Sequence, residues 1–327
     1  MDDPRASVHS LTRRAKDKTV FGQPVKAVAG YVAKSMRPEE AFRATLADCL
    51  AQITANAATL RPQDLKDSRS VEGLHQLRVA FRRLEVALGA FGKEFGQDWI
   101  EELRGRAKIL LGRLSPARDL DVFTGKLLVS PPKSGVSDGL PQLRARAETA
   151  RDTAWLAAQA CIAGADFEIF TDDVAALAGS QLPLTRDNKL PRTARRILDR
   201  QVRRVKKRAK VAKSRKEADL HHLRIALKKL RYTAEFFAPL YPRRAASRYL
   251  RELRGLQNHL GDLNDVANVR SVVGGLLREK NKKDDDSAMR YAAGAMVGWY
   301  GAQVPHAAKQ ALKRYKTFKR VKSFWVK

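Results

Sequence analysis

Two stretches of the sequence carry histidine and basic side chains at spacings that place them together on one side of a helix. The matching positions are His75, Arg78, Arg82 and Glu85 in the first stretch and His221, Arg224, Lys228 and Arg231 in the second. Steps of three and four residues make each set a single helical stripe, and Arg83 and Lys229 flank the two stripes. Guanidinium groups bind phosphate oxygens in pairs, lysine adds a point charge, and a protonated imidazole donates a hydrogen bond. Cations repeating about every 5–6 Å along a helix suit a linear chain of phosphates.

The two stretches belong to an internal repeat with an offset of 146 residues. The run from Leu74 to Leu84, LHQLRVAFRRL, matches the run from Leu220 to Leu230, LHHLRIALKKL. At the same offset Leu114 falls on Leu260, and Asp119 falls on Asp265. Two matches about 40 residues apart without a net gap predict that one structural unit occurs twice.

Apolar residues of both repeats follow the spacing of helices that pack in bundles. They are Leu74, Leu77, Phe81, Leu84, Leu88 and Phe91 in the first repeat and Leu220, Leu223, Leu227, Leu230, Ala234 and Phe237 in the second. Steps alternating between three and four residues are typical of antiparallel helical bundles, and no strand-length alternation is evident. The predicted fold is all-α, with two four-helix bundles related by a pseudo-two-fold axis. The expected organisation is a leader at 1–36 that is flexible or loosely docked, a first bundle at 37–185 and a second bundle at 186–327.

The basic charge is concentrated in the second half of the chain. The formal net charge of +29 divides into +3 for residues 1–185 and +26 for residues 186–327. Residues 192–216 hold 13 Lys and Arg against a single acid, Asp199. The regularly spaced cations of this segment are Arg192, Arg196, Arg200, Arg203, Lys207 and Lys210. Such a stripe repels itself at helical spacing, so we expect an anionic partner to compensate it.

The repeated motifs resemble those of the CHAD family, the conserved histidine α-helical domain. HQLRVAFRRL at 75–84 and HHLRIALKKLRY at 221–232 are similar to its two signature helices, and LSPARDLDV at 114–122 and LGDLND at 260–265 to its second signature. The resemblance covers roughly residues 38–320. It implies two four-helix bundles that bind inorganic polyphosphate through a basic groove or cavity without catalysis.

The resemblance also implies which residues contact the polyanion. From the signature helices these are His75, Arg78, Arg82, Arg83, His221, Arg224, Lys228, Lys229 and Arg231, and the basic segment is expected to add Arg196, Arg200, Arg203 and Lys207. The triphosphatase motif Glu-x-Glu-x-Lys of some relatives is missing, so the chain is expected to be a stand-alone binding module. Association with polyphosphate or storage granules, known for some relatives, is a further possibility that the sequence leaves open.

Other function classes find little support in the sequence. Nucleotide-binding glycine motifs and the HExxH zinc motif are absent, and the two cysteines exclude a disulfide scaffold. We therefore expect no catalytic residues, no metal and no cofactor. Without a signal peptide or a membrane-length apolar run, a cytoplasmic location is expected. The alternative hypothesis is a nucleic-acid-binding protein of the nucleoid type that uses the same basic face.

The C-terminal tail combines basic and aromatic residues, and the sequence leaves its role open. The aromatic residues are Tyr315, Phe318, Phe324 and Trp325, and lysines and arginines lie between them. This composition suits contact with nucleic acid or a membrane surface. It suits equally a helix that docks its aromatic rings on the bundle and leaves its charges outside.

Overall fold

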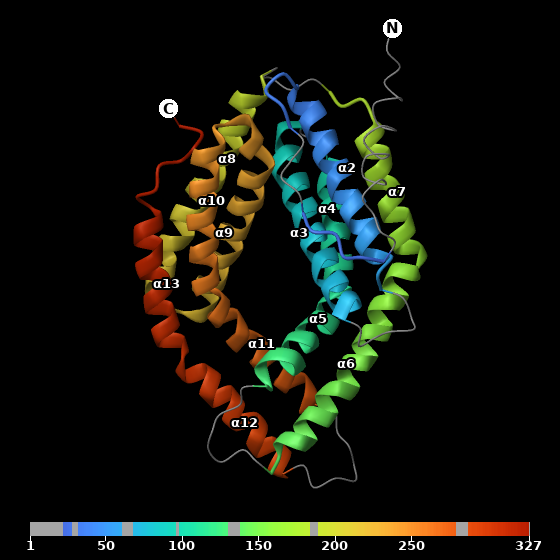
Figure 1. Ribbon diagram of the computed structural model, residues 1–327, viewed down its shortest axis with the longest axis vertical. Helices are drawn as coiled ribbons and strands as arrows, with labels where there is room; N and C mark the ends of the chain where they lie inside the picture. Colours follow the sequence, from blue (N-terminus) through green and yellow to red (C-terminus); the bar gives the residue numbers. More distant parts are fainter. Residues whose placement is uncertain are drawn as a thin grey trace. The chain divides into compact units, whose positions relative to one another are not determined.

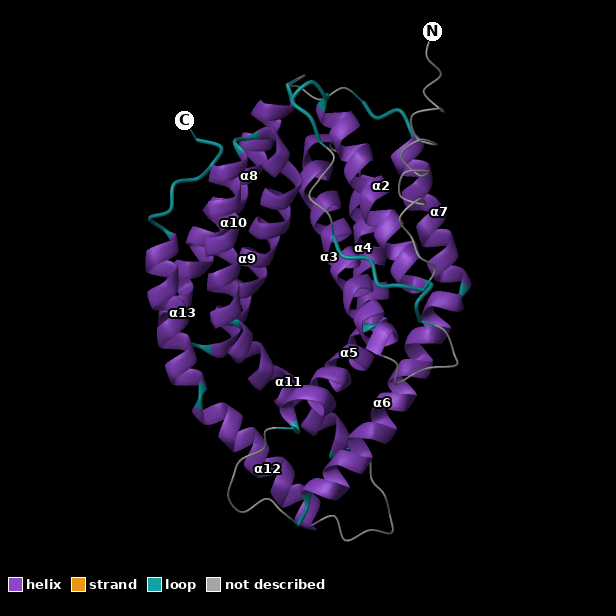
Figure 2. Ribbon diagram, viewed as in Figure 1, coloured by secondary structure: helices purple, strands orange, loops and turns teal. Residues whose placement is uncertain are grey.

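The computed structural model describes residues 22–27, 32–60, 68–95, 98–129, 138–183, 189–278 and 287–326, except for the side chain of Asp262. Most of the predicted leader, 1–36, lies outside these ranges. Within them every regular element is a helix and none is a strand, as Figure 2 shows. The predicted all-α fold is confirmed.

The helices, which Figure 1 labels, fall into two compact units. Unit 1 comprises 1–115, 156–198 and 232–243, and unit 2 comprises 116–155, 199–231 and 244–327. Four helices lie in unit 1, namely α2 (Pro38–Ala57), α3 (Ser68–Phe95), α4 (Asp98–Arg113) and α7 (Ala165–Gly179). Five lie in unit 2, namely α5 (Ser115–Val122, all but its first residue), α10 (Arg243–His259, all but its first residue), α11 (Gly261–Leu276), α12 (Ser287–Ala302) and α13 (Val304–Phe318).

Three helices contribute segments to both units. They are α6 (Leu140–Ala163), α8 (Leu190–Val211) and α9 (Glu217–Phe237). The expected bundle boundaries at 37–185 and 186–327, and the pseudo-two-fold axis, stay predictions.

The predicted apolar seams of the two signature helices are buried. All six seam residues of α3 and all six of α9 are at most 1% exposed. The seams explain why both segments are long helices, since each has one continuous apolar side to bury. At roughly 1.5–3 kcal/mol for each buried large apolar side chain, these faces are a major source of stability for both helices.

Helix boundaries repeat at the offset seen in the sequence. Helix α4 ends at Arg113 and α10 ends at His259, 146 residues later. Helix α5 begins at Ser115 and α11 begins at Gly261, again 146 residues later. The matched sequence motifs therefore coincide with helix ends at matched positions.

Stacked aromatic rings fill the core of unit 1. Phe42 of α2 stacks on Phe91 of α3 with ring centroids 5.1 Å apart, and Phe91 contacts Phe237 at 5.3 Å. All three rings are fully buried. They hold α3 in place, and with it the side chains of the first stripe.

The core of unit 2 includes a turn of π-helix, η1 (Phe123–Leu127), directly after α5. The backbone N–H of Leu128 donates to the carbonyl of Phe123 at 2.9 Å, and the Tyr300 hydroxyl donates to the carbonyl of Leu127 at 3.2 Å. Gly139 allows the chain to pass close to α12 in the same region. A Cβ at this position would lie 1.9 Å from the carbonyl oxygen of Ala288, so a larger residue would not fit. The π-helical turn and the residue before α6 thus both lie in close contact with α12.

Candidate anion-binding face

The first stripe, on α3, turns part of its charge inward. Arg83 is only 1% exposed, and its guanidinium donates to Asp48 Oδ2 at 3.0 Å and to Gln52 Oε1 at 2.6 Å. Its Cζ lies 5.5 Å from the centroid of the Phe236 ring. This charge is neutralised within unit 1, so an anion in solvent has no direct access to it.

Burial dominates the electrostatics of this pair. The pKa of the Asp48 carboxyl is raised above its ordinary value because burial outweighs the attraction of Arg83. Burial likewise raises the pKa of the neighbouring Cys49 thiol to about 12, which leaves the thiol protonated and unreactive. The surroundings of Arg83 are those of a core and not of a binding surface.

Arg78 also points into the protein. It is 5% exposed and donates from Nη1 to the carbonyl of Ser115 at 2.7 Å, at the junction of α4 and α5. Glu85 of the same stripe lies 3.5 Å from Arg104 of α4. His75 and Arg82 are half-buried. The first stripe therefore serves partly to join α3 to α4 and to α2.

The second stripe, on α9, has a different environment. His221 is exposed, and Arg224, Lys228, Lys229 and Arg231 are all partly exposed. Lys229 occupies the position that Arg83 has in α3, yet it keeps solvent access. The repeat places Arg231 where α3 has Glu85, and Leu250 where α4 has Arg104, so the two members of the Glu85–Arg104 pair are both replaced.

His221 reports a positive local potential. Its pKa is lowered from the ordinary value, first by partial burial and then by the charges of Arg224, His222 and Lys228. At neutral pH the imidazole is therefore uncharged, and the groups around it favour any anion that arrives. A bound anion would reverse the electrostatic part of this shift.

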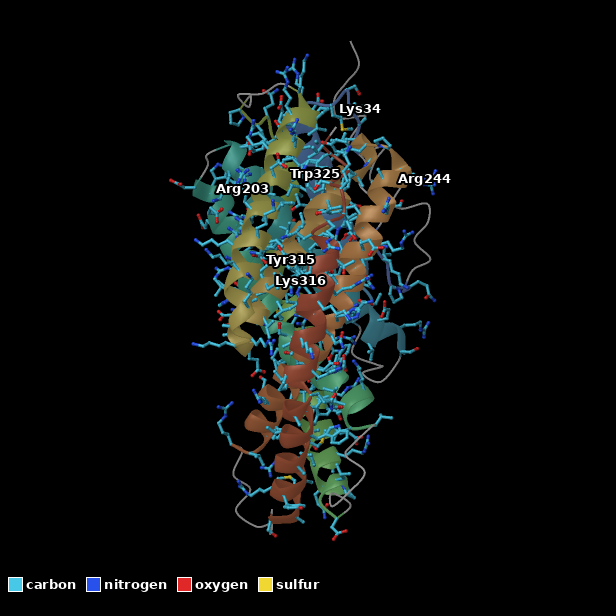
Figure 3. The ribbon with its side chains drawn as sticks, turned by 90° about the vertical axis from the view of Figure 1, so that its left-hand side faces the viewer. Lys34, Arg203, Arg244, Tyr315, Lys316 and Trp325 are labelled. Carbon is cyan, nitrogen blue, oxygen red and sulfur yellow. The ribbon has the colours of Figure 1, made fainter. Side chains whose placement is uncertain are left out.

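Helix α8 adds a dense row of cations. Arg203 and Lys207 are exposed, and Figure 3 shows Arg203 on α8. Arg200 is half-buried. Arg196 lies in the part of α8 that belongs to unit 1, where its Nε donates to Glu94 at 3.1 Å. Of the predicted α8 residues, Arg203 and Lys207 thus have the greatest solvent access.

The single acid of the basic segment has an internal partner. Asp199 Oδ1 accepts a hydrogen bond at 2.9 Å from the indole N–H of Trp325, which is buried. The periodicity of the sequence predicted one stripe of α8 as a contact surface and did not include Arg204, Lys206 and Arg208, which are also exposed. Their signal was the charge count of the segment and not its periodicity.

The second signature contributes contacts within unit 2. The side-chain amide of Asn268 donates to the carbonyl of Asp119 at 3.1 Å, and Lys126 forms an ion pair with Asp265. The ion pair gives the carboxylate of Asp265 a structural role, whereas Asp119 takes part through its backbone.

The aromatic residues of the tail dock on the protein. The Tyr249 ring lies 5.2 Å from Phe318, 5.6 Å from Phe324 and 5.1 Å from Trp325, measured between centroids. Of the two roles left open by the sequence, docking of the rings is the one that the structure supports.

Two further properties hold for the part of the chain that the structure describes. It contains no group of three or more His, Cys, Asp or Glu side chains arranged to hold a metal ion. Within the same ranges, every helix is too short or too polar to span a bilayer.

The chain belongs to the CHAD domain family, whose family model matches residues 44–273. Among solved structures it is similar to the CHAD domain of the plant Ricinus communis, with 24% identity and a TM-score of 0.76 over 91% of this chain and 97% of that one. It is also similar to PptA from Streptomyces chartreusis, with 18% identity and a TM-score of 0.63 over 88% of this chain and 100% of that one. A search of curated proteins found no match to the sequence. At these identities the structural likenesses establish the fold.

Proposed function

We propose that this chain binds inorganic polyphosphate, without catalysis, along an exposed basic face of unit 2 formed by α8 and α9. The observation that carries the proposal is the density of cations there, since 199–216, the part of the basic segment that lies in unit 2, holds ten Lys and Arg against one acid. Family membership supports the polyphosphate specificity, and the environment of His221 supports an anion close to Arg224 and Lys228.

The binding mechanism is electrostatic and multivalent. A phosphate chain laid along α9 would meet Arg224, Lys228 and Arg231 at successive turns, with Arg203 and Lys207 of α8 extending the contact. Each cation contributes modestly, but a chain that engages several at once gains from a high effective concentration. Long polyphosphate should therefore bind far more tightly than orthophosphate.

Release of counterions makes this binding depend on salt. The logarithm of the binding constant should fall linearly with the logarithm of salt concentration, and the slope reports the number of neutralised phosphates. Removing one contacting cation should make the slope shallower by about one.

The deciding experiment is a titration of fluorescently labelled long-chain polyphosphate, competed with duplex DNA at matched phosphate concentration in about 0.15 M salt. The wild-type chain is compared with the double variant R224E/K228E and with the matched control K93E/K108E, which reverses two exposed lysines of unit 1. The proposal expects binding that survives DNA and is lost only in the α9 variant. Equal displacement by DNA, or equal losses in both variants, would contradict it.

Catalysis is checked in the same samples. Orthophosphate release from polyphosphate, measured with and without Mg²⁺, should stay at the level of a protein-free blank. Release that depends on His221 would contradict the non-catalytic part of the proposal.

A further inference from the structure

The outer side of α12 is an apolar surface that the core does not use. Its sixteen residues contain one charged side chain, Arg290. The inner side chains of Met289 and Met296 are buried in the core of unit 2. Tyr291 lies on the opposite side and is 66% exposed, whereas Trp299, three residues after Met296, lies at the edge of the buried side and is 49% exposed.

Small residues separate the two exposed rings. Gly294, Gly298 and Ala302 are also exposed, so no large side chain lies between Tyr291 and Trp299 on this face. Eight residues of helix separate the two rings by about 12 Å. The rings of Tyr291 and Trp299 therefore project from a helix surface on which only small side chains lie between them.

Helix α13, the next helix along the chain, carries exposed cations. Gln303 is the single residue between α12 and α13, and its backbone angles are φ −82° and ψ −17°. The exposed Lys309, Lys313 and Lys316 are spaced by four and three residues and so lie on one side of α13, and Figure 3 shows Lys316 on this helix. From Ser287 to the C-terminus the sequence has nine Lys and Arg and no acid.

We propose that this α12–α13 face docks on the surface of an anionic phospholipid bilayer. Tyr291 and Trp299 would enter the headgroup region, where tyrosine and tryptophan partition favourably, and the lysines of α13 would contact lipid phosphates. The helices would lie on the membrane, as expected from the absence of a membrane-length helix among the described residues. This docking does not depend on the basic face of α8 and α9.

The charge pattern favours an anionic bilayer over two other partners, a second copy of the chain and single-stranded nucleic acid. A second copy of the chain would bring the same acid-free segment and repel the first. Single-stranded nucleic acid favours aromatic rings interleaved with cations along a groove, whereas α12 carries its rings beside one cation and the lysines come later. An anionic bilayer, which has an apolar layer beneath its charged headgroups, matches a surface that carries aromatic rings on α12 and lysines on α13.

The test is co-sedimentation with vesicles of equal parts phosphatidylglycerol and phosphatidylcholine, against vesicles of phosphatidylcholine alone. We expect binding to the anionic vesicles only. Y291S/W299S should lower the partition coefficient about tenfold or more, and K309E/K313E/K316E should lower it at least as much. Two matched controls should bind like wild type, W99S, which removes the 40%-exposed Trp99 of α4, and K93E/K108E/K189E, which reverses three exposed lysines of unit 1.

Tryptophan fluorescence gives a second measurement that is independent of folding yield. Of the four tryptophans, Trp155 and Trp325 are at most 4% exposed, so Trp99→Phe leaves Trp299 as the single exposed indole. In this variant, anionic vesicles should shift the emission to shorter wavelength, and lipids brominated in their acyl chains should quench it.

Three results would overturn the proposal. They are unchanged vesicle binding by Y291S/W299S, an emission that responds to single-stranded DNA but not to vesicles, and a self-association that W299S abolishes in the absence of lipid. Polyphosphate binding should be retained in all α12 variants, so failure of vesicle docking and failure of the proposed function are distinguishable.

Discussion

Helices α3 and α9 carry the same motif and use it differently. In α3, Arg83 is buried against Asp48 and Gln52, whereas its counterpart Lys229 in α9 is partly exposed. Arg78 likewise bonds the carbonyl of Ser115, whereas Arg224 keeps solvent access. The difference comes from neighbouring helices, because α2 presents an acid to α3. A repeated motif therefore does not imply a repeated role.

The largest expected effect is on the free energy of unfolding, when the buried Asp48–Arg83 pair is broken. Asp48→Ala leaves the Arg83 charge buried without its carboxylate, and we expect a loss of about 3–5 kcal/mol in the free energy of unfolding. Lys229→Met, at the equivalent position of α9, should change it by less than about 0.5 kcal/mol. Chemical denaturation followed by circular dichroism measures both. Equal effects would remove the distinction between the helices.

A double variant sharpens this test. Replacing both members of the pair, in D48L/R83M, should restore much of the stability lost in Asp48→Ala, because two apolar side chains need no partner. No recovery in the double variant would show that side-chain packing, and not the isolated charge, causes the loss.

The second effect is on binding, at two positions related by the repeat. Lys228→Ala should weaken polyphosphate binding about five- to tenfold, as expected for loss of a charge-assisted contact. Arg82→Ala, 146 residues earlier, should change it less than about twofold on the same scale. Polyphosphate titrations of both variants at one salt concentration give the comparison. A similar loss at Arg82 would instead favour the groove shared by both repeats that the sequence predicts.

The third effect is a pH dependence of binding. The pKa of His221 lies below its ordinary value in the free protein, through burial and then through Arg224, His222 and Lys228. A bound polyanion favours the protonated form and raises this pKa, so binding takes up a proton. Affinity should therefore increase as pH falls through the region below about 6.5. His221→Gln should flatten this part of the profile, and NMR titration of the imidazole measures the pKa directly.

The smallest effect concerns the lone acid of the basic segment. Asp199→Asn removes a negative charge beside Arg200 and Arg203 while keeping an oxygen that can accept from Trp325. Polyphosphate affinity should rise about twofold, consistent with one half-buried charge that solvent still screens. Weaker binding in this variant would show that Asp199 orders α8 through Trp325 and does not act through its charge.

Much of the fold followed from periodicity in the sequence. The apolar residues of α3 and α9 repeat at steps of three and four over six positions. Such a pattern strongly predicts a helix with one buried face. Pro38 and Pro116 lie in the first turns of α2 and α5, as expected because proline is excluded from helix interiors and favoured in the first turn. These are local rules, and both helices begin where they place them.

The environment of the candidate site was harder to predict from the sequence than the fold. Whether Arg83 faces solvent depends on Asp48, 35 residues earlier, and on how α2 packs against α3. One signal was present, since Asp48 and Gln52 lie one turn apart next to the core residues Cys49 and Ile53. Polar residues at the border of a buried face usually have a partner, and a basic residue at the border of the facing helix is the obvious one.

The π-helical turn at Phe123–Leu127 has a consequence for evolutionary comparison. Such a turn holds one residue more than an α-helical turn, so it accommodates an insertion without lengthening any loop. A relative with a single-residue gap here should be understood as a helix wound differently and not as a shorter connection. Its lysine would be rotated by about 100° relative to Lys126, and the ion pair with Asp265 would be lost with it.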